Sequence, residues 1–121
     1  MKLRIENNAI RFRITPEELD RLRDRGRVEA ATQLFSPDGG HIEGEFIYAI
    51  VVDGEGGAEG CLIEPGYIML ILPREALGDL CDPDGPGYRY QRESHTSDGG
   101  IQRFHAHVEL DKPAKRPRSE A

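Results

Sequence analysis

Apolar and polar residues alternate along residues 1–14, which is the pattern of a strand pair with one buried face. Asn7 and Asn8 interrupt the alternation and form a two-residue turn, because asparagine tolerates the positive φ angles that tight hairpin turns require. The segment therefore predicts an N-terminal hairpin with a wholly apolar side. The pairs on that side are Met1 with Ile14, Leu3 with Phe12 and Ile5 with Ile10.

A helix is predicted directly after this hairpin. Thr15 is a good N-cap residue, Pro16 suits the first helical position, and Glu18 completes a capping box. Gly26 supplies the stop, since glycine adopts the left-handed conformation that ends helices. We therefore expect a helix over residues 16–25.

Two further hairpins are predicted around a repeated Asp-Gly-Gly turn. The first joins residues 27–35 to 41–52, and the second joins residues 88–96 to 101–110. Alignment of apolar residues sets the register of each pair. The expected partners are Val28 with Ile50, Ala30 with Tyr48, Thr32 with Phe46 and Leu34 with Gly44 in the first, and Tyr88 with Leu110, Glu93 with His105 and His95 with Arg103 in the second.

These elements, with short apolar strands at 61–64 and 67–72, predict an α+β fold. We expect mostly antiparallel β hairpins forming a curled sheet or partly closed barrel, with one N-terminal helix and a short second helix at about 73–80. Residues 1–111 are expected to form a single globular domain. Residues 112–121 are rich in proline and charge and lack large apolar side chains, so they predict a disordered tail.

The opening KLRIENNAIRFRIT, the glycine-terminated helix and the following RVEAAT resemble a family of small uncharacterised bacterial proteins, a domain of unknown function. A later strand that ends in ILP at 71–73 fits the same pattern, and the likeness lies mainly in residues 1–35. The C-terminal third departs from that pattern. The resemblance implies a bacterial cytoplasmic protein and assigns no catalytic residue.

Charge and composition argue against several classes of function and location. The 121 residues have a formal net charge of −6, which argues against general nucleic-acid binding because phosphate contacts need a basic surface. No apolar run approaches the roughly 20 residues that a membrane span needs, so we expect no membrane association. The charged N-terminus is not a signal peptide, and the two cysteines suit reduced thiols in the cytoplasm.

The basic side chains of the first hairpin form one candidate binding site. Lys2 is predicted opposite Arg13, and Arg4 opposite Arg11, although like charges on paired strands destabilise a hairpin. Either acidic side chains within the fold offset this repulsion, or an external anionic protein or ligand does. The internal candidates are Glu43, Glu45 and the pair Glu17 and Glu18.

Three histidines form a second candidate site. His105 and His107 are two residues apart on one strand and point to the same side, and the predicted register adds His95 and Glu93. Imidazoles with a carboxylate are ligands for zinc or iron. The same residues also fit an ordinary solvated strand face.

No serine, cysteine or acid–base pair forms a recognisable catalytic motif, and the sequence identifies no cofactor. We therefore expect a small non-enzymatic binding or interaction module that uses the basic face. The alternative is a small metal-dependent enzyme that uses the C-terminal histidines.

Overall fold

The computed structural model describes residues 1–53, 58–82 and 84–111. The predicted tail, residues 112–121, lies outside this part of the chain. The elements are, in chain order, β1 (Lys2–Glu6), β2 (Ala9–Ile14), α1 (Pro16–Arg25), β3 (Arg27–Phe35), β4 (Ile42–Asp53), β5 (Gly60–Glu64), β6 (Tyr67–Pro73), α2 (Ala76–Leu80), β7 (Tyr88–His95) and β8 (Ile101–Leu110).

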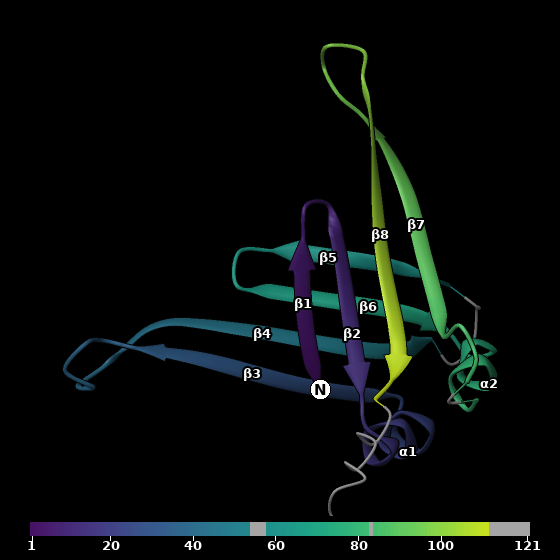
Figure 1. Cartoon of the computed structure of the whole chain (residues 1–121), viewed down its shortest axis with the longest axis horizontal. Helices are drawn as coiled ribbons and strands as arrows, with labels where there is room; N and C mark the ends of the chain where they lie inside the picture. The colour runs from purple at the N-terminus through teal and green to yellow at the C-terminus, as the bar shows by residue number, and fades with distance from the viewer. Residues whose placement is uncertain (54–57, 83, 112–121) are drawn as a thin grey trace, which may run out of the picture.

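The strands form two separate four-stranded sheets, in the orders β1-β2-β8-β7 and β3-β4-β6-β5. One sheet lies across the other at a steep angle, and the two short helices sit together at one end (Figure 1). The expectation of an α+β fold made mostly of strands is confirmed. The expected curled sheet or partly closed barrel is wrong, because neither sheet closes.

Each sheet also contains one parallel pair, β2 with β8 and β4 with β6. The sequence analysis expected hairpin pairing and did not predict these two contacts. Both join strands whose separation along the chain rules out a simple turn; Arg13 and Glu109, for example, are 96 positions apart. No turn sequence therefore marks them.

The first two hairpins have the predicted registers. Leu3 pairs with Phe12 and Ile5 with Ile10, and Asn8 adopts a φ of 57° in the turn. All four predicted pairs between β3 and β4 are present, and a bulge follows at Leu34 and Phe35.

The two Asp-Gly-Gly turns share one hydrogen-bonding scheme. In the first, the Asp38 carboxylate accepts bonds from the Ser36 hydroxyl at 2.5 Å and the Gly40 N–H at 2.8 Å. In the second, Asp98 accepts from Thr96 and from the Gly100 N–H. These bonds lower the pKa of both aspartates, because they stabilise the ionised carboxylate.

Helix α1 begins and ends where predicted. The Thr15 hydroxyl accepts from the Glu18 N–H at 3.2 Å, and the Glu18 carboxylate accepts from the Thr15 N–H at 2.9 Å, which completes the capping box. Gly26 ends the helix with a φ of 74°. Leu19 and Leu22 are buried against the core.

A single apolar core lies between the sheets and under the helices. Phe12 and Val108 from one sheet and Ile50, Leu70 and Leu72 from the other are essentially inaccessible. Helix α2 covers the core with Ala76 and Leu80, within the range predicted for a second helix but shorter than it. In the described residues, neither helix is long and apolar enough to cross a membrane.

Candidate functional site

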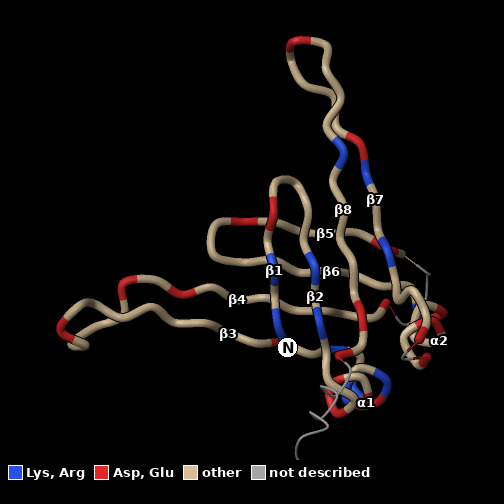
Figure 2. The backbone as a smooth tube through the Cα atoms, viewed as in Figure 1, with Lys and Arg blue, Asp and Glu red and all other residues tan. Residues whose placement is uncertain are grey.

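Both candidate sites from the sequence lie on one surface, the outer side of the sheet β1-β2-β8-β7. On β2, Ile10 and Phe12 point into the core, so Arg11 points outward. On β8, Ala106 is buried, and His105 on its flank therefore faces the same outer side. Figure 2 shows Lys and Arg positions on all four strands of this sheet. The surface, called the basic face below, is formed by Lys2, Arg4, Glu6, Ala9, Arg11, Arg13, Arg89, Gln91, Glu93, His95, Ile101, Arg103, His105, His107 and Glu109.

The parallel pairing of β2 with β8 brings the two predicted sets into one row across the sheet. Arg4 pairs with Arg11, and Arg11 pairs with His107. His107 in turn pairs with Arg89. Arg4, Arg11, His107 and Arg89 are called the central row below. Directly opposed side chains lie about 5 Å apart, so the row concentrates positive charge unless anions offset it.

Acidic side chains of the same sheet offset part of this charge. Lys2 lies 3.5 Å from Asp111, and Arg4 lies 2.8 Å from Glu6. The single Glu109 carboxylate serves two cations, with Arg13 at 3.2 Å and Arg11 at the longer distance of 3.7 Å. The basic side chains of the first hairpin, Lys2, Arg4, Arg11 and Arg13, thus have acidic partners within the fold, which was one of the two alternatives.

These partners are not the ones that the sequence analysis named. Glu18 is buried and bound to the amino group of Met1 at 2.8 Å, and Glu45 accepts a hydrogen bond from Gln33. Glu6 follows its partner Arg4 on β1, whereas Glu109 and Asp111, at and after the end of β8, lie beside the basic side chains because β8 pairs with β2. The ion pairs on the basic face are exposed, so each contributes about 1 kcal/mol or less.

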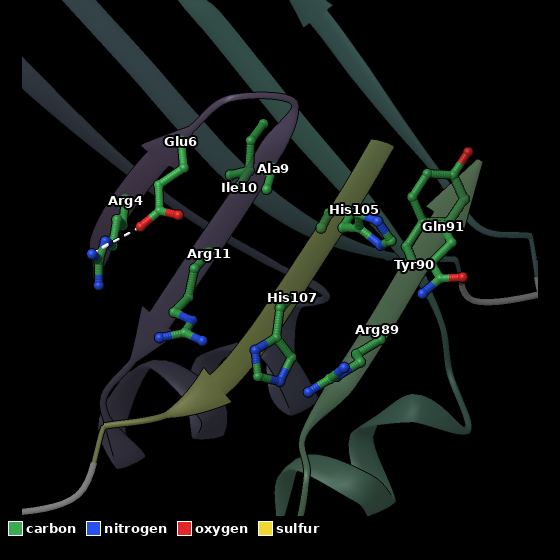
Figure 3. A pocket seen from close by; sticks show the side chains of 11 residues that line it. Arg4, Glu6, Ala9, Ile10, Arg11, Arg89, Tyr90, Gln91, His105 and His107 are labelled. Atoms are coloured by element: carbon green, nitrogen blue, oxygen red, sulfur yellow. Dashed lines mark ion pairs between the residues drawn. The ribbon is translucent and has the colours of Figure 1, made fainter. Parts of the chain in front are cut away.

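A hollow of about 280 Å³ lies in the middle of the basic face (Figure 3). Ala9 contributes to its lining, and its short side chain leaves room between the longer ones. The polar groups around it are Arg4, Glu6, Arg11, Arg89, Gln91, His105 and His107. Lys2 and Arg13, which the sequence placed in the same site, do not line the hollow.

His107 is held in place by the loop before β7. Its Nε2 atom lies 2.7 Å from the carbonyl oxygen of Pro86, so this nitrogen is the donor. The next residue, Gly87, has a φ of 75° and approaches the backbone of Val108 closely. The loop therefore fixes one imidazole of the hollow.

The last hairpin differs from its predicted register by two residues. Tyr88 pairs with Val108, Glu93 with Arg103, and His95 with Ile101. The turn spans residues 96–100, because the Thr96 N–H bonds to the Gly100 carbonyl oxygen at 2.9 Å. The predicted contacts of His95 with Arg103 and of Glu93 with His105 are therefore wrong.

This shift bears on the metal hypothesis. His105 and His107 remain neighbours on β8, but His95 lies four ladder positions from His105, roughly 13 Å along the strand. Across the described ranges, no group of three or more His, Cys, Asp and Glu side chains is placed to hold a metal ion. The histidine site thus stays a prediction that this geometry does not support.

The cysteines lie outside the basic face as free thiols. Cys61 is buried, and burial raises the pKa of its thiol, partly opposed by the charge of Arg92. A thiol with a raised pKa is a poor nucleophile. Cys61 therefore fits a structural role in the core.

The sequence of residues 1–111 matches the model of a family of unknown function, DUF7009. The chain belongs to this family. The match covers all strands of both sheets, including the C-terminal third, where the sequence resemblance was weakest. Comparison with curated proteins and with solved structures gave no match. Membership in DUF7009 assigns no activity, so the function has to be argued from the site.

Arg89 is the basic residue of the hollow that the sequence analysis did not name. Its ladder partner is His107. In this DUF7009 chain, β8 lies between β7, which carries Arg89, and the N-terminal hairpin β1–β2. Arg89 therefore joins the arginines of that hairpin only because β8 pairs with β2, a strand far from it in the sequence. Alternation places Arg89 on the outer side, but no local signal indicates the parallel contact that completes the row.

Proposed function

We propose that the chain is a non-enzymatic binding module whose basic face recognises an anionic group of a protein or ligand. The observation that supports this most is the central row, in which Arg4, Arg11, His107 and Arg89 lie side by side around a hollow. A bound anion would offset the repulsion within the row. It would also provide acceptors for the arginine N–H groups, which form strong hydrogen bonds to carboxylates and phosphates.

The distribution of charge favours a compact anion over a long one. The arginines of this face belong to a chain whose net charge is −6, so the chain as a whole repels a long polyanion. The hollow is also small, at about 280 Å³, which suits one or two anionic groups.

The central row gives the first test. Titrating ¹⁵N-labelled protein with inorganic pyrophosphate at low salt should shift the amide signals of Ala9, Arg11, Arg89, His105 and His107 in a saturable way. Arg11→Gln with Arg89→Gln should raise the Kd for pyrophosphate about tenfold, since two charged donors are lost. Both side chains are exposed, so the fold should be retained.

A matched control comes from helix α1. Arg21→Gln with Arg25→Gln removes the same charge from an exposed surface outside the basic face and should leave the Kd within about twofold. Equal weakening in the two double variants would show that pyrophosphate responds only to net charge. That result, or the absence of saturable shifts at the hollow, would refute the proposal.

A further inference from the structure

The β3–β4 hairpin extends beyond the rest of its sheet as an arm (Figure 1). Strand β6 pairs with β4 only from Ile47 onward, and β3 is an edge strand. Residues 32–46, called the arm below, are therefore a two-stranded ribbon to which the structure adds no third strand from residues 1–53, 58–82 or 84–111. An isolated ribbon of this kind is marginally stable in water, so a contact with another surface would stabilise it.

Large apolar side chains gather at the outer end of the arm. Leu34 is 65% exposed, Phe35 57% and Ile42 47%. Phe35 and Ile42 are ladder partners on one side of the ribbon, whereas Leu34, the preceding residue of β3, points to the other side. Grouped apolar side chains with this exposure are typical of an interaction surface.

The same segment is acidic. Residues 32–46 include Asp38, Glu43 and Glu45 and no lysine or arginine, and Figure 2 shows the acidic positions along the arm and at its tip. Hydrogen bonds from Ser36 and the Gly40 N–H lower the pKa of Asp38, so this carboxylate remains ionised. Within the described part of the chain, none of the three carboxylates forms an ion pair.

The basic face has the complementary chemistry. Its central row is positive, and Arg89 has no ion pair among the described residues. Ile101, 53% exposed on the same side of β8, lies six ladder positions from His107, roughly 20 Å along the strand. The carboxylates of the arm therefore fit the charge of the central row.

The arm cannot reach the basic face of its own chain. The two sheets cross at a steep angle. The arm extends beyond the edge of the sheet β1-β2-β8-β7 and away from its outer side (Figures 1 and 2). Contact therefore requires another molecule. In a two-fold arrangement, each copy can place its arm on the face of the other, which closes the assembly at a dimer.

We infer that the chain forms a reciprocal dimer in which the acidic arm of each copy docks on the basic face of a second copy. This inference rests on the proposed function, because it names the anionic partner of the same face. The contact combines carboxylates against the central row with burial of Phe35 and Ile42. Its charged part is exposed to solvent and is weakened by salt.

Sedimentation velocity on the full chain tests the inference. Between about 1 and 200 µM protein and at about 0.05 M salt, the mass should rise toward twice the 13.5 kDa of one chain, and it should fall again at about 0.5 M salt. Glu43→Gln with Glu45→Gln should weaken the dimer about tenfold. Glu64→Gln with Glu75→Gln, an exposed control outside the arm, should not.

Charge reversal gives the decisive comparison. Glu43→Arg with Glu45→Arg makes the arm positive. Arg11→Glu with Arg89→Glu makes the basic face negative. Each variant alone should be monomeric, because its arm and the face of a second copy then carry charges of the same sign. Mixed in equal amounts, the two should form a heterodimer, since both arm–face contacts again join opposite charges. Circular dichroism confirms that each variant is folded.

A monomeric wild type, or two variants that stay monomeric when mixed, would overturn the inference. The proposed function would survive that outcome if pyrophosphate still bound at the hollow and responded to Arg11 and Arg89. If the dimer formed but pyrophosphate did not bind, a general anion site would be ruled out, while the arm would remain the partner of the face.

Discussion

Replacing Gly87 with alanine is expected to lower the free energy of unfolding by roughly 3 kcal/mol or more. Gly87 has a φ of 75°, a conformation that side chains rarely adopt, and an added Cβ would overlap the carbonyl oxygen of Val108. Val108 cannot move aside easily, because it is fully buried on a central strand and pairs with both Phe12 and Tyr88. Urea denaturation of the two proteins measures the loss.

Gly39→Ala is the matched control for this effect. Gly39 has a nearly identical φ of 74°, but an added Cβ would have nothing within 4 Å. Its replacement should cost only the backbone term, about 1 to 2 kcal/mol. Equal losses in the two variants would show that the close approach to Val108 contributes nothing.

Glu18→Ala is expected to cost about 2 to 3 kcal/mol, more than the usual loss of a helix cap. One carboxylate oxygen accepts from the Thr15 N–H at 2.9 Å, and the other lies 2.8 Å from the Met1 amino group. Removal leaves both donors without their acceptor in a partly buried place. Thr15→Ala, which removes the other half of the capping box alone, should cost about 1 kcal/mol.

The same carboxylate should make stability depend on pH in a defined direction. Burial raises the pKa of Glu18, but hydrogen bonds from the Met1 amino group and Thr15 outweigh it, and the pKa lies below its usual value of 4.5. Because the folded state has the lower pKa, the stabilisation is fully present above pH 4.5 and is lost as the pH falls through the lowered value.

Glu18→Gln isolates this contribution, because glutamine can still take part in a capping box but has no charge. Its unfolding free energy should fall less than that of the wild type when the pH is lowered from about 6 to about 3. Parallel curves for the two proteins would contradict the assigned role of Glu18.

Local features of this fold were predictable and distant ones were not. The capping box, the Asn7-Asn8 turn and the register of β3 with β4 each depend on residues close in sequence, and the structure confirms all three. The last hairpin shows the limit of alternation. A shift of two residues keeps every side chain on the same side of the sheet, so apolar matching does not distinguish Val108 from Leu110 as the partner of Tyr88.

Only the part of the candidate site that depends on residues close in sequence could be predicted. Arg4 and Arg11 belong to one local hairpin, and their opposition follows from its turn. The addition of His107 and Arg89 depends on β8 lying parallel to β2, a contact that no turn and no short motif indicates. The hollow itself depends on that contact, and it became visible only in three dimensions.

The pairing of β2 with β8 also means that, during synthesis, β2 is made long before the strand with which it pairs. Strand β2 leaves the ribosome early, but its parallel neighbour is synthesised 96 residues later. At about 5 to 20 residues per second, this delay is about 5 to 20 s. During that time Ile10, Phe12 and Ile14 lack the strand beside which they are finally buried. We therefore expect the nascent chain, more than the finished molecule, to need protection from aggregation.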